Sequence, residues 1–166
     1  MAILNGTNGN NSLTGSLDND SLYGLDGHDT LNGGAGLDTL NGGGGNDLIN
    51  GGLGNDTMSG GAGADIFVFN TAFGTQNLDT IQDFSAIDDI IHLENDHFKA
   101  LLTPGTLASG AFVSGTKALD SDDRIIYESS TGRLLYDADG SGSTAAIQFA
   151  KIQSGLTLTN ADFLVI

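Results

Sequence analysis

A nine-residue pattern repeats seven times without slippage between Gly6 and Val68. The first position of every unit is glycine. The sixth position is Asn11 in the first unit and aspartate in the other six. The eighth position is always apolar, and its occupants in chain order are Leu13, Leu22, Leu31, Leu40, Ile49, Met58 and Phe67. Such a strict short period indicates that each unit adopts the same local structure and buries its apolar residue against its neighbours.

Each part of the unit predicts a simple element. Six glycine-rich residues suit a tight turn, because glycine adopts positive φ without steric cost. Three residues with an apolar one in the middle suit a short strand that points one side chain inward and two outward. Two consecutive units then close one coil, and stacked coils bury a continuous row of apolar side chains.

The aspartates at position six should line up at the turns. Turns two units apart fall on the same edge, which predicts one column of Asp29, Asp47 and Asp65 and another of Asp20, Asp38 and Asp56. No Lys or Arg precedes Lys99, so the like charges of each column need a cation. Carboxylate and carbonyl oxygens favour Ca²⁺ over Zn²⁺ or Cu²⁺, and Mg²⁺ fits an all-protein turn less well.

The seven units resemble the RTX (hemolysin-type) calcium-binding nonapeptide, GGxGxDxUx, in which U is a large apolar residue. This resemblance implies a parallel β-roll, a right-handed β-helix that holds Ca²⁺ between successive turns on each edge. In that family the sixth-position aspartate supplies a side-chain oxygen, and positions two and four supply backbone carbonyls. The residues nominated in this way are Gly34, Gly36, Asp38, Gly43, Gly45, Asp47, Gly52, Gly54, Asp56, Gly61, Gly63 and Asp65, together with Asp20, Gly27 and Asp29.

Three units depart from the pattern. Asn11 keeps an oxygen but loses the charge, Ser16-Leu-Asp18 replaces Gly-x-Gly in the second unit, and Leu25 stands at position two of the third. Pairing of units along each edge allows roughly five shared Ca²⁺ sites, of which those that involve the first two units are the least regular.

The composition changes after Val68. Glycine becomes rarer there, and all five basic residues of the chain lie in this part. Asp79-Thr-Ile-Gln-Asp83-Phe84 and the following Asp88-Asp89-Ile-Ile-His-Leu93 look like the segment that covers the open end of the roll in RTX proteins. The resemblance implies that Asp79 and Asp83 ligate a last Ca²⁺. The alternative is that both residues only cap and solvate a strand.

The remaining residues predict a small, mostly antiparallel β cap with one short helix. The helix is expected over residues 95–102, and Pro104-Gly105 should end it. Residues 124–128 and 133–137 predict a β-hairpin, and residues 146–152 and 161–166 predict further strands. The expected organisation of this all-β chain is therefore a roll over residues 1–68 and a cap over residues 69–166.

Composition and motifs exclude several functions. A net charge of −16 argues against nucleic-acid binding, and no apolar run is long enough to span a membrane. Cysteine is absent and the N-terminus lacks the features of a signal peptide. No catalytic constellation is present, so we expect no enzymatic activity. Asp137-Ala-Asp139-Gly-Ser141-Gly142 matches half of an EF-hand loop, but Gln148 replaces the bidentate Glu, which favours a plain turn over an accessory Ca²⁺ site.

Three functional hypotheses follow. The first is a secreted, extracellular module from the C-terminal region of a bacterial protein, which folds on binding Ca²⁺ and is exported by type I secretion machinery that reads Asp162-Phe-Leu-Val-Ile166. The second is a surface, polysaccharide or ice-binding module that uses the outward row of Ser21, Thr39 and Thr57. The third is the non-catalytic C-terminal part of a secreted protease, lipase or epimerase.

Overall fold

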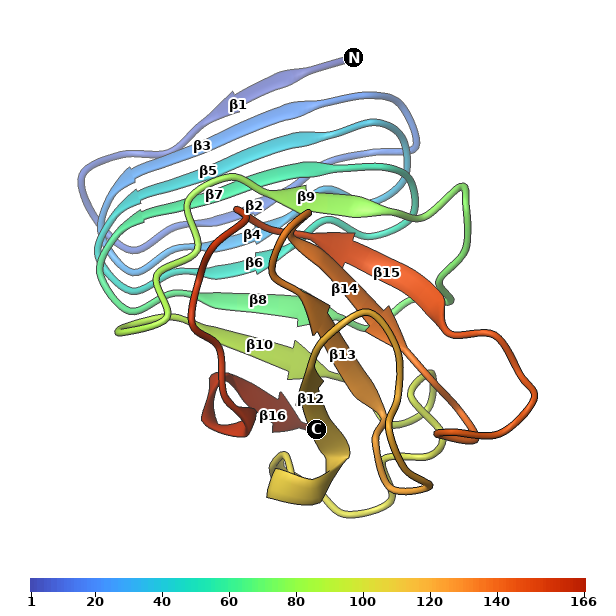
Figure 1. Cartoon of the computed structure of the whole chain (residues 1–166). Helices are drawn as coiled ribbons and strands as arrows, with labels where there is room; N and C mark the ends of the chain where they lie inside the picture. Colours follow the sequence, from blue (N-terminus) through green and yellow to red (C-terminus); the bar gives the residue numbers. More distant parts are fainter.

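The structure is a computed structural model that describes residues 1–166, and it is built almost entirely of β-strands. Two sheets enclose the core (Figure 1). The nine-stranded sheet runs in the spatial order β1 (Ile3–Asn5), β3 (Ser21–Asp26), β5 (Thr39–Gly44), β7 (Thr57–Ala62), β9 (Asp79–Ile81), β15 (Ile147–Lys151), β14 (Arg133–Tyr136), β13 (Ile125–Glu128) and β12 (Phe112–Ser114). The seven-stranded sheet runs in the order β11 (Gly105–Thr106), β16 (Phe163–Val165), β10 (Ile90–Leu93), β8 (Ile66–Phe69), β6 (Leu48–Asn50), β4 (Thr30–Asn32) and β2 (Ser12–Thr14).

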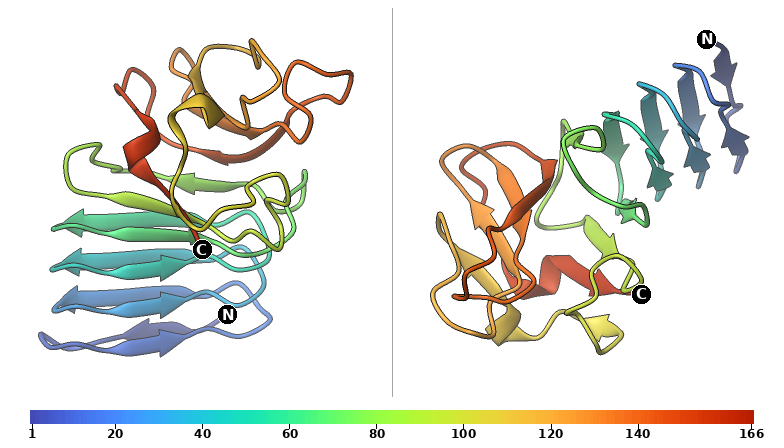
Figure 2. Two further views of the ribbon diagram at one scale, coloured as in Figure 1. Left: turned by 90° about the horizontal axis from the view of Figure 1, so that it is seen from below. Right: turned by 90° about the vertical axis from the view of Figure 1, so that its right-hand side faces the viewer.

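The repeats form the predicted parallel β-roll. Each strand pairs in parallel with the equivalent strand two units along the chain, so Ser21 pairs with Thr39 and Thr39 with Thr57 in one sheet. Thr30 pairs with Leu48 in the other sheet. Figure 2 shows the coils stacked along one axis, with the cap at one end. The period of nine therefore fixes both the topology and the register of this part of the chain.

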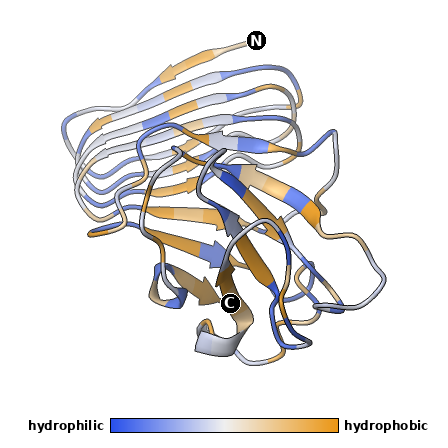
Figure 3. Cartoon of the chain, viewed as in Figure 1, coloured by the Kyte–Doolittle hydropathy of each residue, from blue (hydrophilic) through white to orange (hydrophobic).

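The eighth positions form the core of the roll. Leu22, Leu31, Leu40, Ile49, Met58 and Phe67 are each at most 1% exposed. Residues on either side of them point outward, and the hydropathy of the strands alternates accordingly (Figure 3). Leu13, in the first unit, is only partly buried because its coil is the outermost one.

The strand β1 belongs to the same pattern although it precedes the first complete unit. Ile3, Leu4 and Asn5 pair with Ser21, Leu22 and Tyr23, so Ala2–Asn5 correspond to positions six to nine of a repeat. Leu4 thereby takes the place of an eighth-position residue and packs against the core.

Two strands after the repeats extend the roll by a further coil. Thr57 pairs with Thr80 and Ile66 with Ile90, so the offset between partners becomes longer than two units while the pairing stays parallel. Ile81 and Ile91 continue the two apolar rows and are fully buried. The segment expected to cover the end of the roll is therefore itself an additional coil.

The cap continues both sheets instead of forming separate ones. The predicted hairpin is present as β13 and β14, which pair antiparallel, and β15 joins it to β9 in parallel. The last strand, β16, pairs in parallel with β10 and antiparallel with β11. A single cluster of 24 buried residues runs from Leu22 to Val165, so the sheets and the core pass the expected domain boundary at residue 68 without a break.

The helix expected over residues 95–102 is wrong, because the segment forms a series of turns. Phe98 N–H donates to Glu94 O at 3.0 Å, but Leu101 N–H donates to Phe98 O in a tighter turn. Phe98 packs against Phe73, Tyr136 and Phe149, and this aromatic cluster holds the segment in place. A segment this short gains little from helical propensity, so tertiary packing decides its conformation.

The only helical segments are two 3₁₀ turns, Ser109–Ala111 and Asn160–Asp162. Neither is long and apolar enough to cross a membrane.

Candidate metal centres

The turns of units three to seven share one backbone conformation. Positions two and four have positive φ, as in Gly43 (φ 108°) and Gly45 (φ 123°). Leu25, at position two of the third unit, is the only non-glycine residue with positive φ, at 80°. The coils also approach closely, since a Cβ on Gly54 would collide with the carbonyl oxygen of Gly36 in the preceding coil. Glycine is therefore required both for the turn and for the stacking of turns.

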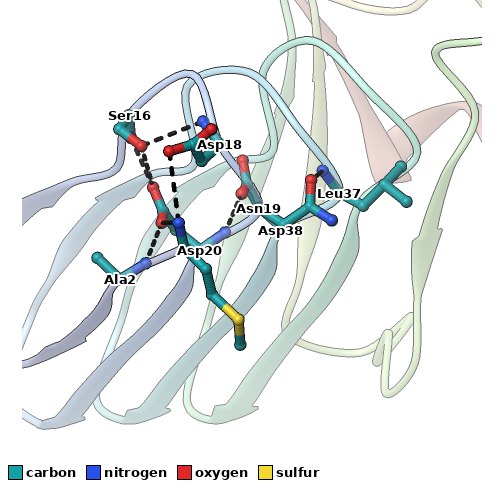
Figure 4. Close-up of polar contacts among 8 residues, drawn as sticks. Ala2, Ser16, Asp18, Asn19, Asp20, Leu37 and Asp38 are labelled. Carbon is teal, nitrogen blue, oxygen red and sulfur yellow. Dashed lines mark hydrogen bonds and ion pairs between the residues drawn. The ribbon is translucent and has the colours of Figure 1, made fainter.

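The aspartates of the even-numbered units form the predicted column along one edge. The backbone N–H of Asp20 donates to Asp38 Oδ1 at 2.7 Å, and that of Asp38 donates to Asp56 Oδ1 at 2.8 Å. Figure 4 shows the first part of this column, from Ala2 through Asp20 to Asp38. At the other end Asp56 N–H donates to Asp79 Oδ1 at 3.0 Å, so Asp79 continues the column into the extra coil.

The odd-numbered units form the second column. Asp29 N–H donates to Asp47 Oδ1 at 2.7 Å, and Asp47 N–H donates to Asp65 Oδ1 at 2.9 Å. Asp65 N–H then donates to Asp89 Oδ1 at 2.9 Å. Sequence reasoning did not single out Asp89, although Asp89-Ile90-Ile91 repeats positions six to eight of the unit and could have revealed it.

The second oxygen of five column aspartates has no partner. Oδ2 of Asp29, Asp38, Asp47, Asp56 and Asp65 is buried and makes no hydrogen bond. A buried carboxylate oxygen without a donor is costly, and proteins normally satisfy such groups with a hydrogen bond or a metal ion. These five oxygens are therefore the clearest sign of ligand positions in the chain.

Backbone carbonyls complete the set of donors. The carbonyl oxygens at position four, such as those of Gly36, Gly45 and Gly54, accept no hydrogen bond in the chain. Those of Gly36 and Gly45 face the same position of the next coil on their edge, Gly54 and Gly63. Carboxylate and carbonyl oxygens from successive turns are the hard ligands that Ca²⁺ prefers, so the residues present fit this ion.

The raised pKa values of the column aspartates also indicate that these carboxylates need a cation. Burial raises the pKa of Asp56 and of Asp65 to about 6, and that of Asp79 to about 7. Burial also raises the pKa values of Asp38, Asp47 and Asp89. In the absence of a cation these carboxylates therefore bind protons more readily than exposed ones do, and a divalent ion would compete with those protons.

The first units and the end of the roll differ from the regular turns. Asp20 Oδ2 accepts hydrogen bonds from both the N–H and the hydroxyl of Ser16, each at 2.7 Å, and the hydroxyl bond lowers the pKa of Asp20. Asp20 therefore has no buried oxygen without a hydrogen-bond partner, unlike the aspartates of units three to seven. Asp83 lies over the turn of unit seven, where its carboxylate accepts from the N–H groups of Gly60 and Gly61 at 3.0 Å.

The loop between β14 and β15 holds the EF-hand-like sequence. Asp139 N–H donates to Asp137 Oδ1 at 3.2 Å, and Thr144 N–H donates to Asp139 Oδ2 at 3.1 Å, while Asp139 Oδ1 is buried without a partner. No three His, Cys, Asp or Glu side chains converge on a metal site anywhere in the structure. On the edges of the roll each turn offers only one carboxylate to a metal ion, and backbone carbonyl oxygens would be the other ligands.

Comparisons with known proteins identify the repeats. The sequence model of a family described as RTX calcium-binding nonapeptide repeat (4 copies) matches residues 5–40 and 33–67. Residues 5–67 are therefore similar to RTX calcium-binding repeats, and the match leaves the cap uncovered. This RTX roll is thus a calcium-binding repeat module, and the match ends just before the extra coil of Asp79 and Asp89.

Two solved structures are similar to this chain at low sequence identity. The AlgE6R3 subunit from the Azotobacter vinelandii mannuronan C5-epimerase is 22% identical, with a TM-score of 0.37 over 96% of this chain and 80% of that subunit. The AlgE6R2 subunit from the same organism's enzyme is also 22% identical, with a TM-score of 0.37 over 98% of this chain and 91% of that subunit. No curated protein matches the sequence.

Proposed function

We propose that this chain is a calcium-dependent folding module that remains unfolded at low Ca²⁺ and folds outside the cell. The observation that carries the proposal is the set of five buried Oδ2 atoms without a partner, all at position six of the RTX repeats. Without a cation the fold has to bury like charges in two columns, which opposes folding. An ion site that does not exist in the unfolded chain links binding to folding.

The ligands proposed for Ca²⁺ are those of the regular turns. The aspartates of units three to seven would each supply Oδ2, and the glycines at position four would supply carbonyl oxygens that accept no hydrogen bond. The glycines at position two of units four to seven would add a further carbonyl oxygen. Bound Ca²⁺ would supply the positive charge that neutralises each column. Five unpartnered oxygens support about five ions in the roll. Asp79 and Asp89 would serve the last coil, while Asp83 and Asp20 are already engaged with backbone N–H groups.

We also propose that the C-terminal residues act as a type I export signal that is accessible only before folding. Phe163 and Val165 are at most 3% exposed, and Asp162 caps the preceding 3₁₀ turn with Thr159. β16 lies between β10 and β11, so neither of its edges is free in the folded state. Export in the unfolded form and folding in the calcium-rich exterior are therefore compatible, whereas export after folding would require β16 to leave the core.

The test is far-UV circular dichroism during a Ca²⁺ titration, with Mg²⁺ as the control ion. We expect a cooperative gain of β structure in the range of roughly 10⁻⁴–10⁻³ M, where extracellular calcium modules operate. Mg²⁺ should not produce it. A chain that is already folded in chelator, and unchanged up to tens of millimolar Ca²⁺, would refute the proposal.

A matched pair of variants tests the sites. Asp47→Asn removes a charged ligand from the middle of a column, whereas Asp26→Asn removes an exposed charge from the same stretch of repeats. We expect the first to raise the calcium midpoint several-fold and the second to leave it unchanged. If both variants shift the calcium midpoint equally, calcium binding depends only on the overall charge of the repeats, and the assignment of Asp47 as a ligand is wrong.

Export is tested separately in a host with a type I system. Deletion of residues 162–166 should abolish secretion, because the signal would be lost. The variant Phe149→Ala, which removes a buried core side chain but leaves residues 162–166 intact, serves as a control for loss of stability. Undiminished export of the deletion would rule out the proposed signal without affecting the calcium sites.

A further inference from the structure

One row of outward side chains crosses the nine-stranded sheet from the roll into the cap. In the roll it consists of hydroxyl residues in direct register, since Ser21 pairs with Thr39, Thr39 with Thr57 and Thr57 with Thr80. Thr80 in turn pairs with Lys151 of β15. The neighbours Leu22, Leu40, Met58 and Ile81 are buried, so the row itself faces outward.

The row ends on positive charge. Lys151 pairs with Arg133 across β15 and β14, and Lys151 is exposed. Arg133 uses Nε for Gln148 at 2.9 Å and Nη1 for Glu128 at 3.5 Å, which leaves other N–H donors of its guanidinium group free. Of the five basic side chains in a chain of net charge −16, two therefore stand side by side at the end of the hydroxyl row.

A hollow of about 610 Å³ lies next to Arg133. Lys117 lines it with Arg133, so a third basic residue faces the same place. Thr116, Ser141 and Thr144 add hydroxyl groups, and Leu135 lies among the lining residues. Asp137 is the one acidic side chain in the lining. A concave site that combines a few polar groups with apolar surface is typical of small-ligand and sugar sites.

We propose that this row and the hollow together bind a linear anionic polysaccharide. The hydroxyl residues repeat at the strand spacing of about 4.8 Å, so they can hydrogen-bond successive sugar units of a chain laid across the strands. Lys151, Arg133 and Lys117 then pair with acidic groups of the same chain. Charge complementarity selects the partner, because the rest of the molecule repels anions and these three cations are concentrated at the end of the row.

Other occupants fit the surface less well. Nucleic acid needs a long basic stripe to match its closely spaced phosphates, and three cations at one end of the row do not form such a stripe. Ice binding needs a flat and uniform array of hydroxyl groups, which the cationic side chains of Lys151 and Arg133 interrupt. The matching row of the second sheet offers no equivalent, since Thr30 is followed by Leu48, Ile66 and Ile90.

The experiment is isothermal titration of the calcium-loaded full chain with oligosaccharides of matched length. One arm uses a carboxylated glycan, a second a sulfated glycan and a third a neutral glucan, all equilibrated with the same Ca²⁺ buffer. We expect at least one anionic glycan to bind, with an affinity that falls as salt rises, and the neutral glucan not to bind. Binding of the neutral glucan as tight as that of the anionic ones, or no binding up to millimolar glycan, would overturn the proposal.

Matched variants locate the site. Lys151→Gln and Lys117→Gln should each weaken binding about three- to fivefold, and Thr39→Val about threefold. Lys99→Gln, a basic residue outside the row and the hollow, and Thr30→Val, at the same repeat position on the other sheet, should change nothing. Equal losses in the control variants would overturn the assignment.

Circular dichroism of each sample keeps this test independent of the calcium proposal. A chain that folds with Ca²⁺ but binds no glycan would refute only the glycan surface. A chain that binds glycan with its fold unchanged in chelator would refute only the calcium-dependent folding.

Discussion

Asp79 provides a test in which the size of the effect depends on calcium. The side chain is 3% exposed, and burial raises its pKa from 3.8 to about 7. One pKa unit corresponds to about 1.4 kcal/mol, so the ionised carboxylate destabilises the calcium-free fold by about 4 kcal/mol at pH 8. The variant Asp79→Asn removes this charge and keeps an amide oxygen that can accept the N–H of Asp56.

The direction of the pH dependence follows from the raised pKa. Below pH 4 the carboxyl group of Asp79 is protonated in the calcium-free fold and does not destabilise it. The free energy of unfolding then falls as the pH rises through about 7, because the buried group has to ionise. Asp79→Asn should therefore be more stable than wild type in chelator at pH 8, by up to about 4 kcal/mol. At pH 4 the two proteins should be equally stable.

Saturating calcium should reduce the difference in stability between the two proteins. For a site with a Kd of about 10⁻⁴–10⁻³ M, 10 mM Ca²⁺ contributes about 1.4 to 2.7 kcal/mol through binding to the folded state. Loss of one carboxylate ligand removes most of this contribution, so the advantage of Asp79→Asn at pH 8 should shrink from about 4 kcal/mol in chelator to about 1.3 to 2.6 kcal/mol in calcium. The assay is circular dichroism at pH 4 and pH 8. In 10 mM Ca²⁺ it follows urea unfolding, and in chelator it follows the refolding that a stabilising osmolyte such as trimethylamine oxide induces.

The control is Asp96→Asn, which removes an exposed acidic residue outside the columns. It should shift stability by less than about 0.5 kcal/mol in every condition. If Asp79→Asn destabilises the protein equally with and without calcium, the carboxylate acts only through packing or hydrogen bonding, and the reasoning from its burial and charge is wrong.

Three further substitutions test the turns and the cap, each by thermal or urea unfolding at fixed calcium. Leu25→Gly should stabilise the protein by up to about 1 kcal/mol because it relieves a positive φ of 80°, whereas Leu17→Gly, at an exposed residue without positive φ, should not. Gly54→Ala should cost at least about 3 kcal/mol, because its φ is 131° and a Cβ would meet the preceding coil, while Gly74→Ala, where a Cβ meets nothing, should be almost neutral. Phe163→Ala should cost about 3 to 5 kcal/mol and lower the calcium-loaded melting temperature, and an unchanged melting temperature would show that the C-terminal strand does not contribute to the core.

The regular part of the fold could be predicted from the sequence because one period controls several properties at once. Position eight places Leu40 and Ile49 in the core, position six places Asp38 and Asp47 on the edges, and the two-unit coil sets the strand register. These features are local and repeat in every unit, so a single pattern was enough to identify the elements and the columns.

The end of the roll was harder to predict because the spacing changes there. Longer loops before Thr80 and Ile90 stretch the offset between equivalent positions beyond two units, which hides the continuation of the repeat. Asp89 was missed for this reason. Its neighbour Asp83 attracted attention through a family resemblance, yet its carboxylate binds N–H groups of the preceding turn.

The turns over residues 95–102 were missed for a different reason. Their apolar residues have the spacing of a short amphipathic helix, but Phe98 is held by three aromatic rings that come from distant parts of the chain. The N–H of Ala100 also donates to the hydroxyl of Tyr136 at 2.7 Å. Such contacts are a property of the tertiary structure, and no local pattern encodes them.

The aspartate column of the odd-numbered units connects the proposed calcium sites to the C-terminal strand, which lies far from them in sequence. Asp89 accepts the N–H of Asp65 and directly precedes β10, and β10 pairs on its other side with β16. β16 has no partner of its own except β10 and the two-residue strand β11, so it cannot be held in the sheet unless β10 is ordered. Order in the last coil therefore determines whether the C-terminal residues are buried. If the proposed calcium-dependent folding and export signal both hold, this arrangement would leave the segment accessible while calcium is scarce and would bury it once the columns are neutralised.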